Sequence, residues 1–499
     1  MSASSAEDEK MAVHISLLSG KSVTLECSQD ESITCLKRRA QQALGLGGGA
    51  GRLISAAGDC LNATTDATVK RMRIMHNDTL TLSCSPTKVQ VTEKAFAVIL
   101  GDASVACFGT RLYGGDSSAL QDQLVSVQHV AAAARAFAAI RGDGTVVTWG
   151  DSDHGGDSSH VQHQLHDVEC IASNFWAFAA IRRDGSVVTW GSAEDGGDSS
   201  AVQDQLLLVQ KIQQTETAFA AILGDGSVVA WGCEIQGGDA SAVQHQLKNV
   251  REIQSTVEAF AAILADGSVV SWGHRATGGD SSRVVHQLTN VQCIQSSSGA
   301  FAAILADRSV VTWGNPSDGG DCSGVQEQLQ NVQEIQATDS AFAALRYDGT
   351  VIAWGSARSG SKTSSLQSEL FNIEALASSW NMFFGIRRGG SVVSWGFFYN
   401  DVYGSLSWRG NGRGSGSSSS HHRAAAAVKL LQATDSNDSS VCVIYDDGTV
   451  QSWSVDSMSH QEPPKDQLKN VQQLQAARCG GFAAILGDGS VVVWGEHKD

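Results

Sequence analysis

The sequence contains little proline, little charge and no paired cysteines. Only 4 of its 499 residues are proline and 17% are charged, whereas 52 are glycine, so we expect many glycine turns and few rigid linkers. The 11 cysteines are odd in number and never spaced as Cys-x-x-Cys, which argues against a disulfide framework and a zinc site. We therefore expect free thiols in a reducing compartment. The net charge of −17 disfavours nucleic-acid partners, because an acidic surface repels phosphate.

Signals for export and for membrane insertion are also missing from the sequence. The first ten residues, "MSASSAEDEK", are polar and acidic and lack the basic and then apolar order of a signal peptide. No apolar run approaches the roughly 20 residues that a membrane-spanning helix needs. We expect residues 1–10 to be disordered, and we expect a soluble protein of the cytoplasm or nucleus without a membrane partner.

What the sequence does contain is a repeat of 41 residues. Seven Trp-Gly pairs follow one another at this spacing, and a Phe-Gly pair takes the same place one period earlier. Two further tryptophans come after an interval of 58 residues and then one of 41. The aromatic positions are Phe108, Trp149, Trp190, Trp231, Trp272, Trp313, Trp354, Trp395, Trp453 and Trp494. Residues 88–499 therefore hold ten units, with a Gly/Ser-rich insertion at about 397–427 that we expect to be a flexible loop.

Each unit contains the pattern of a β-hairpin. In the unit that begins at Val250, a short strand "VREIQ" is followed by the apolar runs "AFAAIL" and "SVVSWG" on either side of Asp-Gly. Apolar runs joined by Asp-Gly indicate a hairpin with a tight primed turn. Seven units have Asp-Gly at this place, and the exceptions are Asp102-Ala103, Asp307-Arg308 and Gly389-Gly390. The first two exceptions put a Cβ where glycine is preferred, so we expect strained or different turns there.

The size of the unit indicates the architecture. Three or four strands in 41 residues match one blade of a β-propeller, and a single unit cannot bury its own faces, so neighbouring units must stack. We predict a mainly β protein in which ten hairpin repeats form a propeller-like ring or a superhelix.

The repeat pattern "DG.V..WG" resembles the repeats of the regulator of chromosome condensation family over about residues 88–499. The resemblance implies a β-propeller, which in that family has seven blades. This chain has ten shorter units, and "GGDSSxVQxQL" replaces the family's usual Gly-Gln-Leu-Gly stretch. Three arrangements remain open at this point: a larger ring, a seven-bladed ring with extra units, and an open superhelix.

Residues 11–83 lack the repeat and predict a separate small domain. A hairpin at "VHISLLSGKSVTLE", a helix with a stripe of Ile33, Leu36, Ala40 and Leu44, and strands at "GRLIS" and "DTLTLS" give a β-β-α-β-β order. "LSGKSVTLE" and "RLISAAG" resemble ubiquitin, which implies a β-grasp fold. The resemblance places Leu18 and Ile54 on the apolar patch through which ubiquitin binds partners, with Thr81 and Ser83 at the histidine and valine positions of that patch. The chain continues into the first repeat, so we do not expect conjugation.

Two sequence features are typical of metal sites. His160, His163 and His166 stand at intervals of three, but the equivalent positions of other units vary, which indicates a polar surface. The segment "GGDSS" recurs in six units with small changes. Its copies lie 41 residues apart instead of at the short period of calcium-binding repeats, so we expect turns in which Asp or Ser caps the backbone. We predict no metal and no cofactor.

Enzyme motifs are lacking as well, since the sequence has no GxSxG, no P-loop and no HExxH. We therefore expect a non-catalytic protein-interaction scaffold, linked to the ubiquitin pathway through its ubiquitin-like domain. Candidate binding residues are Leu18 and Ile54 in that domain and three residues that vary between repeats, Asp153, His154 and His160. The expected partners are ubiquitin receptors and proteasome or ligase components, with no small-molecule ligand.

Two alternatives follow from the family resemblance. Similar repeats occur in HECT-type ubiquitin ligases, so the chain could be a relative or a component of such a ligase without the catalytic domain. The regulator of chromosome condensation family also includes a guanine-nucleotide exchange factor, so a small GTPase is the other candidate partner.

Overall fold

The computed structural model describes one continuous stretch of the repeats, residues 88–363, and shorter stretches on either side of it. These are residues 10–17, 21–44, 52–55, 60–61, 68–83, 366–388, 391–396, 428–433, 440–445, 450–454, 464, 467–468, 471–476, 481–486 and 491–494. Residues 1–9 of the segment 1–10 that was predicted to be disordered lie outside the described residues. The predicted loop at 397–427 and the turn at Gly389-Gly390 lie outside them as well. None of the described helices is long and apolar enough to cross a membrane.

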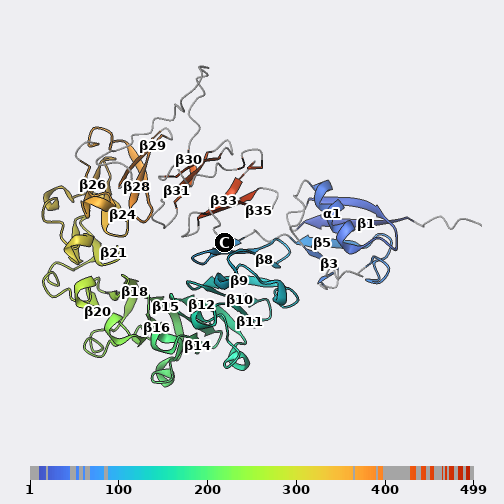
Figure 1. Cartoon of the computed structure of the whole chain (residues 1–499), viewed down its shortest axis with the longest axis horizontal. Coiled ribbons are helices and arrows are strands. Elements are labelled where there is room, and N and C mark those ends of the chain that lie inside the picture. Colours follow the sequence, from blue (N-terminus) through green and yellow to red (C-terminus); the bar gives the residue numbers. More distant parts are fainter. Residues whose placement is uncertain are drawn as a thin grey trace, which may run out of the picture.

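Ten antiparallel sheets of three strands make up most of the described chain, and in each sheet the second strand of the repeat pairs with the first and the third. Figure 1 shows successive sheets following one another around a ring. The predicted mainly β fold with ten hairpin repeats is confirmed.

In chain order the strands of these sheets are β6 (Lys88–Val91), β7 (Ala95–Ile99), β8 (Val105–Gly109); β9 (Val127–Ala132), β10 (Ala136–Arg141), β11 (Val146–Gly150); β12 (Val168–Ser173), β13 (Ala177–Arg182), β14 (Val187–Gly191); β15 (Val209–Gln214), β16 (Ala218–Leu223), β17 (Val228–Gly232); β18 (Val250–Ser255), β19 (Ala259–Leu264), β20 (Val269–Gly273); β21 (Val291–Ser296), β22 (Ala300–Leu305), β23 (Val310–Gly314); β24 (Val332–Ala337), β25 (Ala341–Arg346), β26 (Val351–Gly355); β27 (Ile373–Ser378), β28 (Met382–Arg387), β29 (Val392–Gly396); β30 (Val428–Ala433), β31 (Ser440–Tyr445), β32 (Val450–Ser454); β33 (Val471–Ala476), β34 (Phe482–Leu486) and β35 (Val491–Trp494).

Short helical turns connect one repeat to the next. Those that follow a third strand are η1 (Arg111–Tyr113), η3 (Ser152–His154), η5 (Ala193–Gly197), η7 (Glu234–Gln236), η8 (Arg275–Thr277), η9 (Pro316–Asp318) and η11 (Ala357–Ser359). Those that precede the next first strand are η2 (Ser118–Leu120), η4 (Gln162–Gln164), η6 (Gln203–Gln205) and η10 (Gln326–Gln328).

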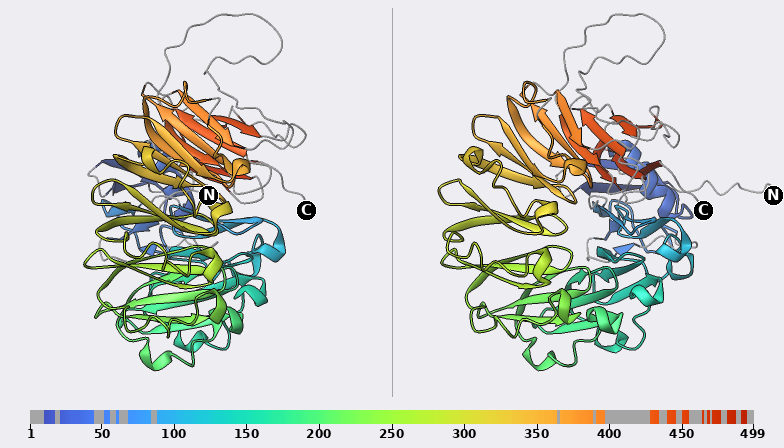
Figure 2. Two further views of the ribbon diagram at one scale, coloured as in Figure 1. Left: turned by 90° about the vertical axis from the view of Figure 1, so that its left-hand side faces the viewer. Right: turned by 60° about the vertical axis from the view of Figure 1, so that its left-hand side comes forward.

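The described residues of the N-terminal part form a mixed sheet and one helix, and they lie to one side of the ring (Figures 1 and 2). Its elements are β1 (Met11–Leu17), β2 (Ser22–Cys27), α1 (Ile33–Leu44), β3 (Arg52–Ile54), β4 (Cys60–Leu61) and β5 (Thr79–Ser83). The strand order is β2-β1-β5-β3-β4, with β1 and β5 parallel at the centre, which is a β-grasp arrangement. The predicted apolar stripe of the helix is confirmed, because Ile33, Leu36, Ala40 and Leu44 are all buried. The short strand β4 was not predicted.

Contacts between a glycine and two aromatic rings join neighbouring repeats. In each of eight described repeats a Phe on the second strand stacks on the Trp of the third, as Phe178 does on Trp190 at 5.2 Å. The Trp190 indole N–H donates to the carbonyl of Gly155 in the preceding repeat, at 3.0 Å. Gly155 has φ +84°, and a Cβ built on it would lie 2.6 Å from Phe178. The first glycine of "GGDSS" is therefore required by the ring of the next repeat.

The hairpin turn makes a second contact between repeats. The amide of Val168, at the start of a first strand, donates to the carbonyl of Gly144 in the preceding turn at 2.9 Å. Asp167, just before this strand, has φ 54°, which is uncommon for a residue with a Cβ. A Cβ on Gly144 would lie 3.0 Å from the Cα of Asp167, so the turn glycine is needed for close approach as well as for its φ.

The hairpin turn itself is not the primed turn that the sequence predicts. The Gly144 amide donates to the Arg141 carbonyl at 2.9 Å, and the Arg141 amide donates to the Thr145 carbonyl at 2.9 Å. The loop thus has three residues, 142–144, of which only Gly144 has a positive φ. This geometry is a type I turn followed by a left-handed residue, the usual three-residue hairpin loop. The prediction of a primed turn was wrong, because Asp143 keeps a negative φ and caps the loop from its side chain.

Two repeats form the same turn without glycine. Ala103 has φ 58° and Arg308 has φ 69°, so both occupy the left-handed region that the glycines of the other repeats occupy. For a residue with a Cβ this conformation is less favourable by about 1–2 kcal/mol. The predicted strain at these two turns is therefore present, while their hydrogen-bonding remains that of the other repeats.

The polar residues of "GGDSS" and of the following "VQxQL" are used inside the repeat. Asp157 accepts a hydrogen bond from the amide of Ser159 at 2.9 Å, and five other repeats do the same. The buried Ser158 donates to the Gln162 side chain at 3.0 Å. Gln162 in turn donates to the Val146 carbonyl at 2.9 Å. The prediction that this segment is a capped turn is confirmed.

The ring is closed by contact between the last repeat and the first. Val89, Phe96 and Val98 from the first sheet form one buried cluster with Ala483 and Ile485 from the tenth. The C-terminal strands accordingly lie beside the first sheet in Figure 1. Of the three arrangements left open by the sequence, a larger ring with ten repeats is the one observed.

We expect Gly319→Ala to lower the free energy of unfolding by about 2–4 kcal/mol, since the left-handed conformation and overpacking each cost energy. Gly319 has φ +96°, and a Cβ there would lie 2.5 Å from Phe342. Gly324→Ala is the matched control, because a Cβ at Gly324 would meet nothing within 4 Å. Urea unfolding followed by far-UV circular dichroism measures both. Equal midpoints for the two variants would contradict the proposed role of the glycine.

Capping by aspartate predicts a loss of stability in acid. In twelve described turns the pKa of an Asp is held below its ordinary value by a hydroxyl or an amide two residues on; at Asp143 the Thr145 hydroxyl is the largest cause. A lowered folded-state pKa gives stability that is complete above the unfolded-state pKa, about 3.9, and is lost as pH falls below it. We expect the urea midpoint to fall steeply between about pH 4 and pH 2. The triple variant Asp143→Asn, Asp184→Asn and Asp225→Asn keeps the capping oxygen, so its urea midpoint should fall less steeply with decreasing pH. An unchanged pH profile in this variant would exclude these turns as the cause.

Candidate functional site

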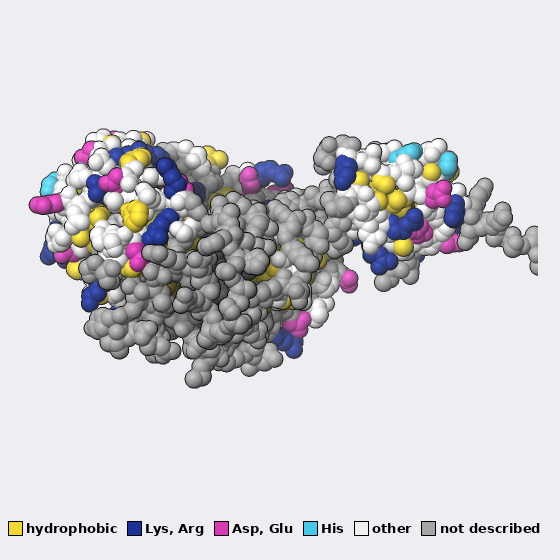
Figure 3. Space-filling model, turned by 90° about the horizontal axis from the view of Figure 1, so that it is seen from above, with side chains coloured by type: hydrophobic (Ala, Val, Ile, Leu, Met, Phe, Trp, Pro, Cys, Tyr) yellow, Lys and Arg dark blue, Asp and Glu magenta, His cyan; other side chains and the backbone are white. Residues whose placement is uncertain are grey.

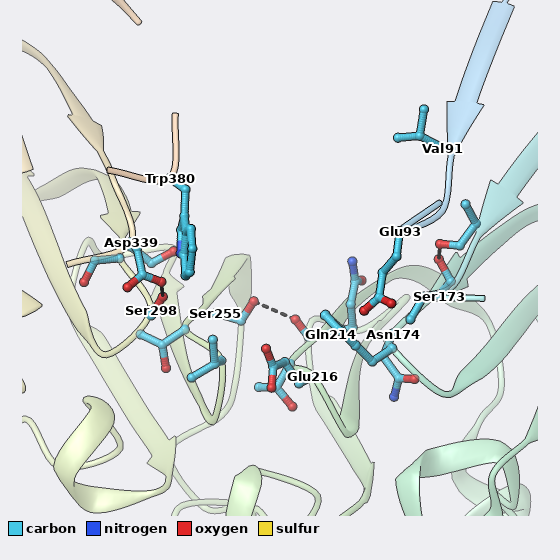
Figure 4. A pocket seen from close by; sticks show the side chains of 18 of the residues that line it. Val91, Glu93, Ser173, Asn174, Gln214, Glu216, Ser255, Ser298, Asp339 and Trp380 are labelled. Atoms are coloured by element: carbon cyan, nitrogen blue, oxygen red, sulfur yellow. Dashed lines mark hydrogen bonds between the residues drawn. The ribbon is translucent and has the colours of Figure 1, made fainter. Parts of the chain in front are cut away.

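A cavity of about 950 Å³ opens at the centre of the ring. It is lined by the turns between the first and second strands of repeats one to eight and by the tenth repeat (Figure 4). The first strands surround the axis, so the turns that end them meet at one mouth. This is where side chains from many repeats converge, and it is the strongest candidate binding site in the described part of the chain.

A ladder of backbone hydrogen bonds runs around this mouth. The amide of one residue per repeat donates to the carbonyl of the residue 41 positions later, with N···O distances of 2.7–3.3 Å. The residues of the ladder are Glu93, Ala134, Phe175, Glu216, Val257, Ser298, Asp339 and Trp380. Because only backbone atoms make these bonds, the bonds themselves set no requirement on the side chains at these positions.

The residue just before each ladder position has a structural role instead. It is usually Thr, Ser or Asn, and its side chain is buried. Thr215, for example, donates to the carbonyl of Gln236 at 3.1 Å and accepts from the amide of Ala218 at 3.0 Å. This pair of bonds holds the turn, and the next side chain is thereby presented to the cavity.

The charged residues among the described lining of the cavity are Glu93, Glu216 and Asp339. Glu93 has a partner, since Arg135 Nε lies 4.0 Å from its Oε2. Asp339 is held by hydroxyls: Ser298 donates to Oδ1 and Ser340 donates to Oδ2. Next to Asp339 on the ladder is Trp380, a residue that is 36% exposed. Figure 4 shows Asp339 and Trp380 side by side, with Glu93 across the cavity.

The residues predicted from repeat-to-repeat variation do not reach this cavity. Asp153, His154 and His160 lie on the connection between β11 and β12, and none of them is among the lining residues. Asp153 and His160 are exposed. His154 is only 4% exposed, and its ring stacks on Trp176 with the ring centres 4.3 Å apart. It lies 3.5 Å from Asp151 as well, so its side chain is part of the packing.

In the N-terminal sheet, Leu18 lies outside the described residues. Ile54 on β3 is half-buried and pairs with Thr81 on β5, which in turn pairs with Ser16 on β1. The row across the sheet that contains Ile54 is therefore mostly polar. Lys37 on α1 lies 3.7 Å from Asp102 in the first repeat, an ion pair between this sheet's helix and the ring.

Asp339 and Trp380 were missed in the sequence, although a signal for them is present there. The residue type at the ladder position changes from repeat to repeat. Acidic, aromatic and small side chains all occur among the eight positions between 93 and 380, which lie 41 residues apart. Variation at a fixed place in an otherwise regular repeat is the signal, and only the fold shows that these eight positions form one circle.

The described residues include no group of three or more His, Cys, Asp and Glu side chains placed to hold a metal ion. The histidines at 160, 163 and 166 do not form such a group. Burial raises the pKa of the Cys107 thiol to about 11.

No protein-family model matches the chain, and no curated protein matches it in sequence. Among solved structures, the chain is similar to the computationally designed Ika8 protein, with 15% identity over 66% of this chain and 96% of that one, at a TM-score of 0.30. It is also similar to the entire ectodomain of the Physcomitrella patens receptor kinase CR4, with 15% identity over 55% and 73%, at a TM-score of 0.31.

A third similar structure is the CRINKLY WD40 ectodomain of the Arabidopsis thaliana receptor kinase ACR4, with 13% identity over 57% of this chain and 94% of that one, at a TM-score of 0.29. The ring architecture follows from the sheets of this chain and from the contact between its first and tenth repeats.

The packing of His154 predicts an effect on stability. We expect His154→Ala to lower the free energy of unfolding by about 1–2 kcal/mol, because the stacked contact with Trp176 is lost. His160→Ala is the control on the exposed end of the same connection, with an expected change within about 0.5 kcal/mol. Urea unfolding measures both free energies. If His154→Ala leaves the free energy of unfolding unchanged, the stacking of His154 on Trp176 does not stabilise the fold.

Proposed function

We propose that this chain is a non-catalytic scaffold for protein–protein interactions. The observation that supports the proposal is that recurring and varying residues of the repeat lie in different places. Those that recur, such as the Trp-Gly pair, "GGDSS" and the Thr or Ser before the ladder, make contacts within the ring. Those that vary, including Asp339 and Trp380, present their side chains at one mouth. A rigid ring with a varied mouth suits recognition of a specific partner.

The proposed link to the ubiquitin pathway rests on the N-terminal sheet. Its strand order and the described helix α1 are those expected of a ubiquitin-like β-grasp domain, and Ile54 matches the isoleucine of the ubiquitin patch. We assign residues 11–83 to this domain and residues 88–499 to repeats of the regulator of chromosome condensation type. On this proposal the protein acts in the cytoplasm or nucleus, with ubiquitin receptors and proteasome or ligase components as partners.

The surface that we assign to the N-terminal domain is centred on Leu18 and Ile54. The polar row that contains Thr81 and Ser16 makes this surface smaller and less apolar than that of ubiquitin. We therefore expect weaker binding and a narrower choice of receptors than ubiquitin has. On the ring, Asp153 and His160 remain candidate contacts at the outer edge, because both are exposed.

We expect Ile54→Ala in the full chain to weaken binding to a ubiquitin-receptor domain by about tenfold or more, since apolar anchors dominate small interfaces. Met75→Ala is the matched control, because Met75 is an apolar residue of the same part of the chain with 66% exposure. A panel of purified receptor domains, measured by isothermal titration calorimetry, gives the affinities. Equal binding by wild type and Ile54→Ala would contradict the assignment of Ile54 to the binding surface. If no receptor domain binds the wild type, the proposed link to the ubiquitin pathway is wrong.

A further inference from the structure

The lining of the central cavity differs in charge from the outer surface of the ring. On the face of the ring that Figure 3 shows, the described surface carries both basic and acidic side chains. Among the described lining residues, the charged ones are carboxylates alone, at Glu93, Glu216 and Asp339. Of these, Glu93 is already close to Arg135. The mouth therefore combines a negative potential with a shape that concentrates it, which favours a cationic ligand.

Asp339 is the best oriented of the three carboxylates. Its two side-chain oxygens each accept one hydroxyl hydrogen bond, from Ser298 and from Ser340, and its backbone is bonded on both sides in the ladder. The carboxylate is thus fixed in position before any ligand arrives. Each oxygen of an ionised carboxylate has about two acceptor sites, so one site on each remains for a ligand. A fixed carboxylate with one open site on each oxygen suits a planar donor with two parallel N–H groups.

Trp380 stands next to this carboxylate. The Asp339 amide donates to the Trp380 carbonyl at 2.7 Å, which fixes the two residues as neighbours on the ladder. Trp380 is 36% exposed, whereas the tryptophans on the described third strands are buried against phenylalanine, as Trp354 and Trp395 are. An exposed indole face beside a carboxylate attracts a cation by charge and by cation–π interaction together. Guanidinium fits this pair better than ammonium does, because it is planar and stacks on aromatic rings.

We propose that the mouth of the ring binds an arginine side chain in an exposed basic segment of a partner protein, with the guanidinium between Asp339 and Trp380. This inference rests on the proposed scaffold function and names the chemistry of its partner. A cavity of about 950 Å³ is larger than one side chain, so residues on either side of the arginine enter as well. The side chains of Gln214, Ser296 and Ser378 also line the cavity, and amide and hydroxyl groups of this kind are suited to hydrogen bonding with the peptide backbone of the segment.

The test uses the full chain and synthetic peptides. Arrays of nonapeptides, random except at a central Arg, citrulline, Lys or Glu, are probed with the purified protein. Citrulline keeps the shape of arginine and removes its charge. We expect the Arg array to retain the most protein and the citrulline and Glu arrays the least. Equal retention on the Arg and citrulline arrays would overturn the proposal.

The strongest Arg nonapeptide is then labelled with fluorescein and titrated by fluorescence anisotropy. We expect Asp339→Asn to weaken binding about tenfold or more and Trp380→Ala about fivefold, because each removes one of the two attractions for guanidinium. Asp204→Asn and Phe371→Ala are matched controls, since both residues are exposed and lie outside the cavity lining. These controls should bind within about twofold of wild type. Thermal unfolding of every variant verifies that Asp339→Asn and Trp380→Ala remain folded.

Three outcomes would reject the inference. In one, Asp339→Asn binds the Arg peptide as wild type does. In another, the control variants lose as much affinity as the mouth variants. In the third, free spermine binds at the mouth but no peptide does, which would make the ligand a small polyamine. The proposed scaffold function is tested separately: if a protein partner still binds the full chain and its affinity is unaffected by Asp339→Asn, the scaffold stands and only the arginine site is rejected.

Discussion

Packing between neighbouring repeats is the constraint on which this structure depends. A sheet of three short strands cannot bury both of its faces, so each repeat is stable only against the next. The contact that joins them involves few atoms. An indole N–H donates to a glycine carbonyl, and a phenylalanine ring packs against the same glycine so closely that a Cβ would not fit there. Six successive described repeats make this indole bond, from Trp149 to Trp354, and the tenth sheet packs against the first.

That constraint also explains how the ring can vary where it binds. The glycine, the paired aromatic rings and the capped turn hold each repeat from its outer side, and the backbone ladder holds it at the axis. The ladder uses no side-chain atoms, so its bonds are compatible with the Glu, Ala, Phe, Val, Ser, Asp and Trp found at its eight described positions. A surface with a fixed backbone and variable side chains can evolve to bind a specific partner.

Much of this could be predicted from the sequence, because regular structure leaves regular spacing. The 41-residue interval predicted ten hairpin sheets, and the stripe from Ile33 to Leu44 predicted the helix of the N-terminal sheet. Comparison of the "GGDSS" copies correctly identified a turn in a segment that resembles a metal or catalytic site when it is read alone. The turn type was predicted wrongly, since Asp-Gly serves in both two-residue and three-residue loops and the hydrogen bonds of the loop decide between them.

The sequence by itself determined the repeat, its hairpins, the places where only glycine fits and the polar residues that cap turns, since all of these follow from contacts within a unit or between successive units. Only the tertiary structure decided that ten units close into a ring, because closure depends on a small rotation per repeat that no single unit encodes. The same holds for the site. His154 varies between repeats like an exposed residue, yet its ring is covered by Trp176. Asp339 and Trp380 are 41 residues apart in the chain and become neighbours because the ladder bonds one repeat to the next.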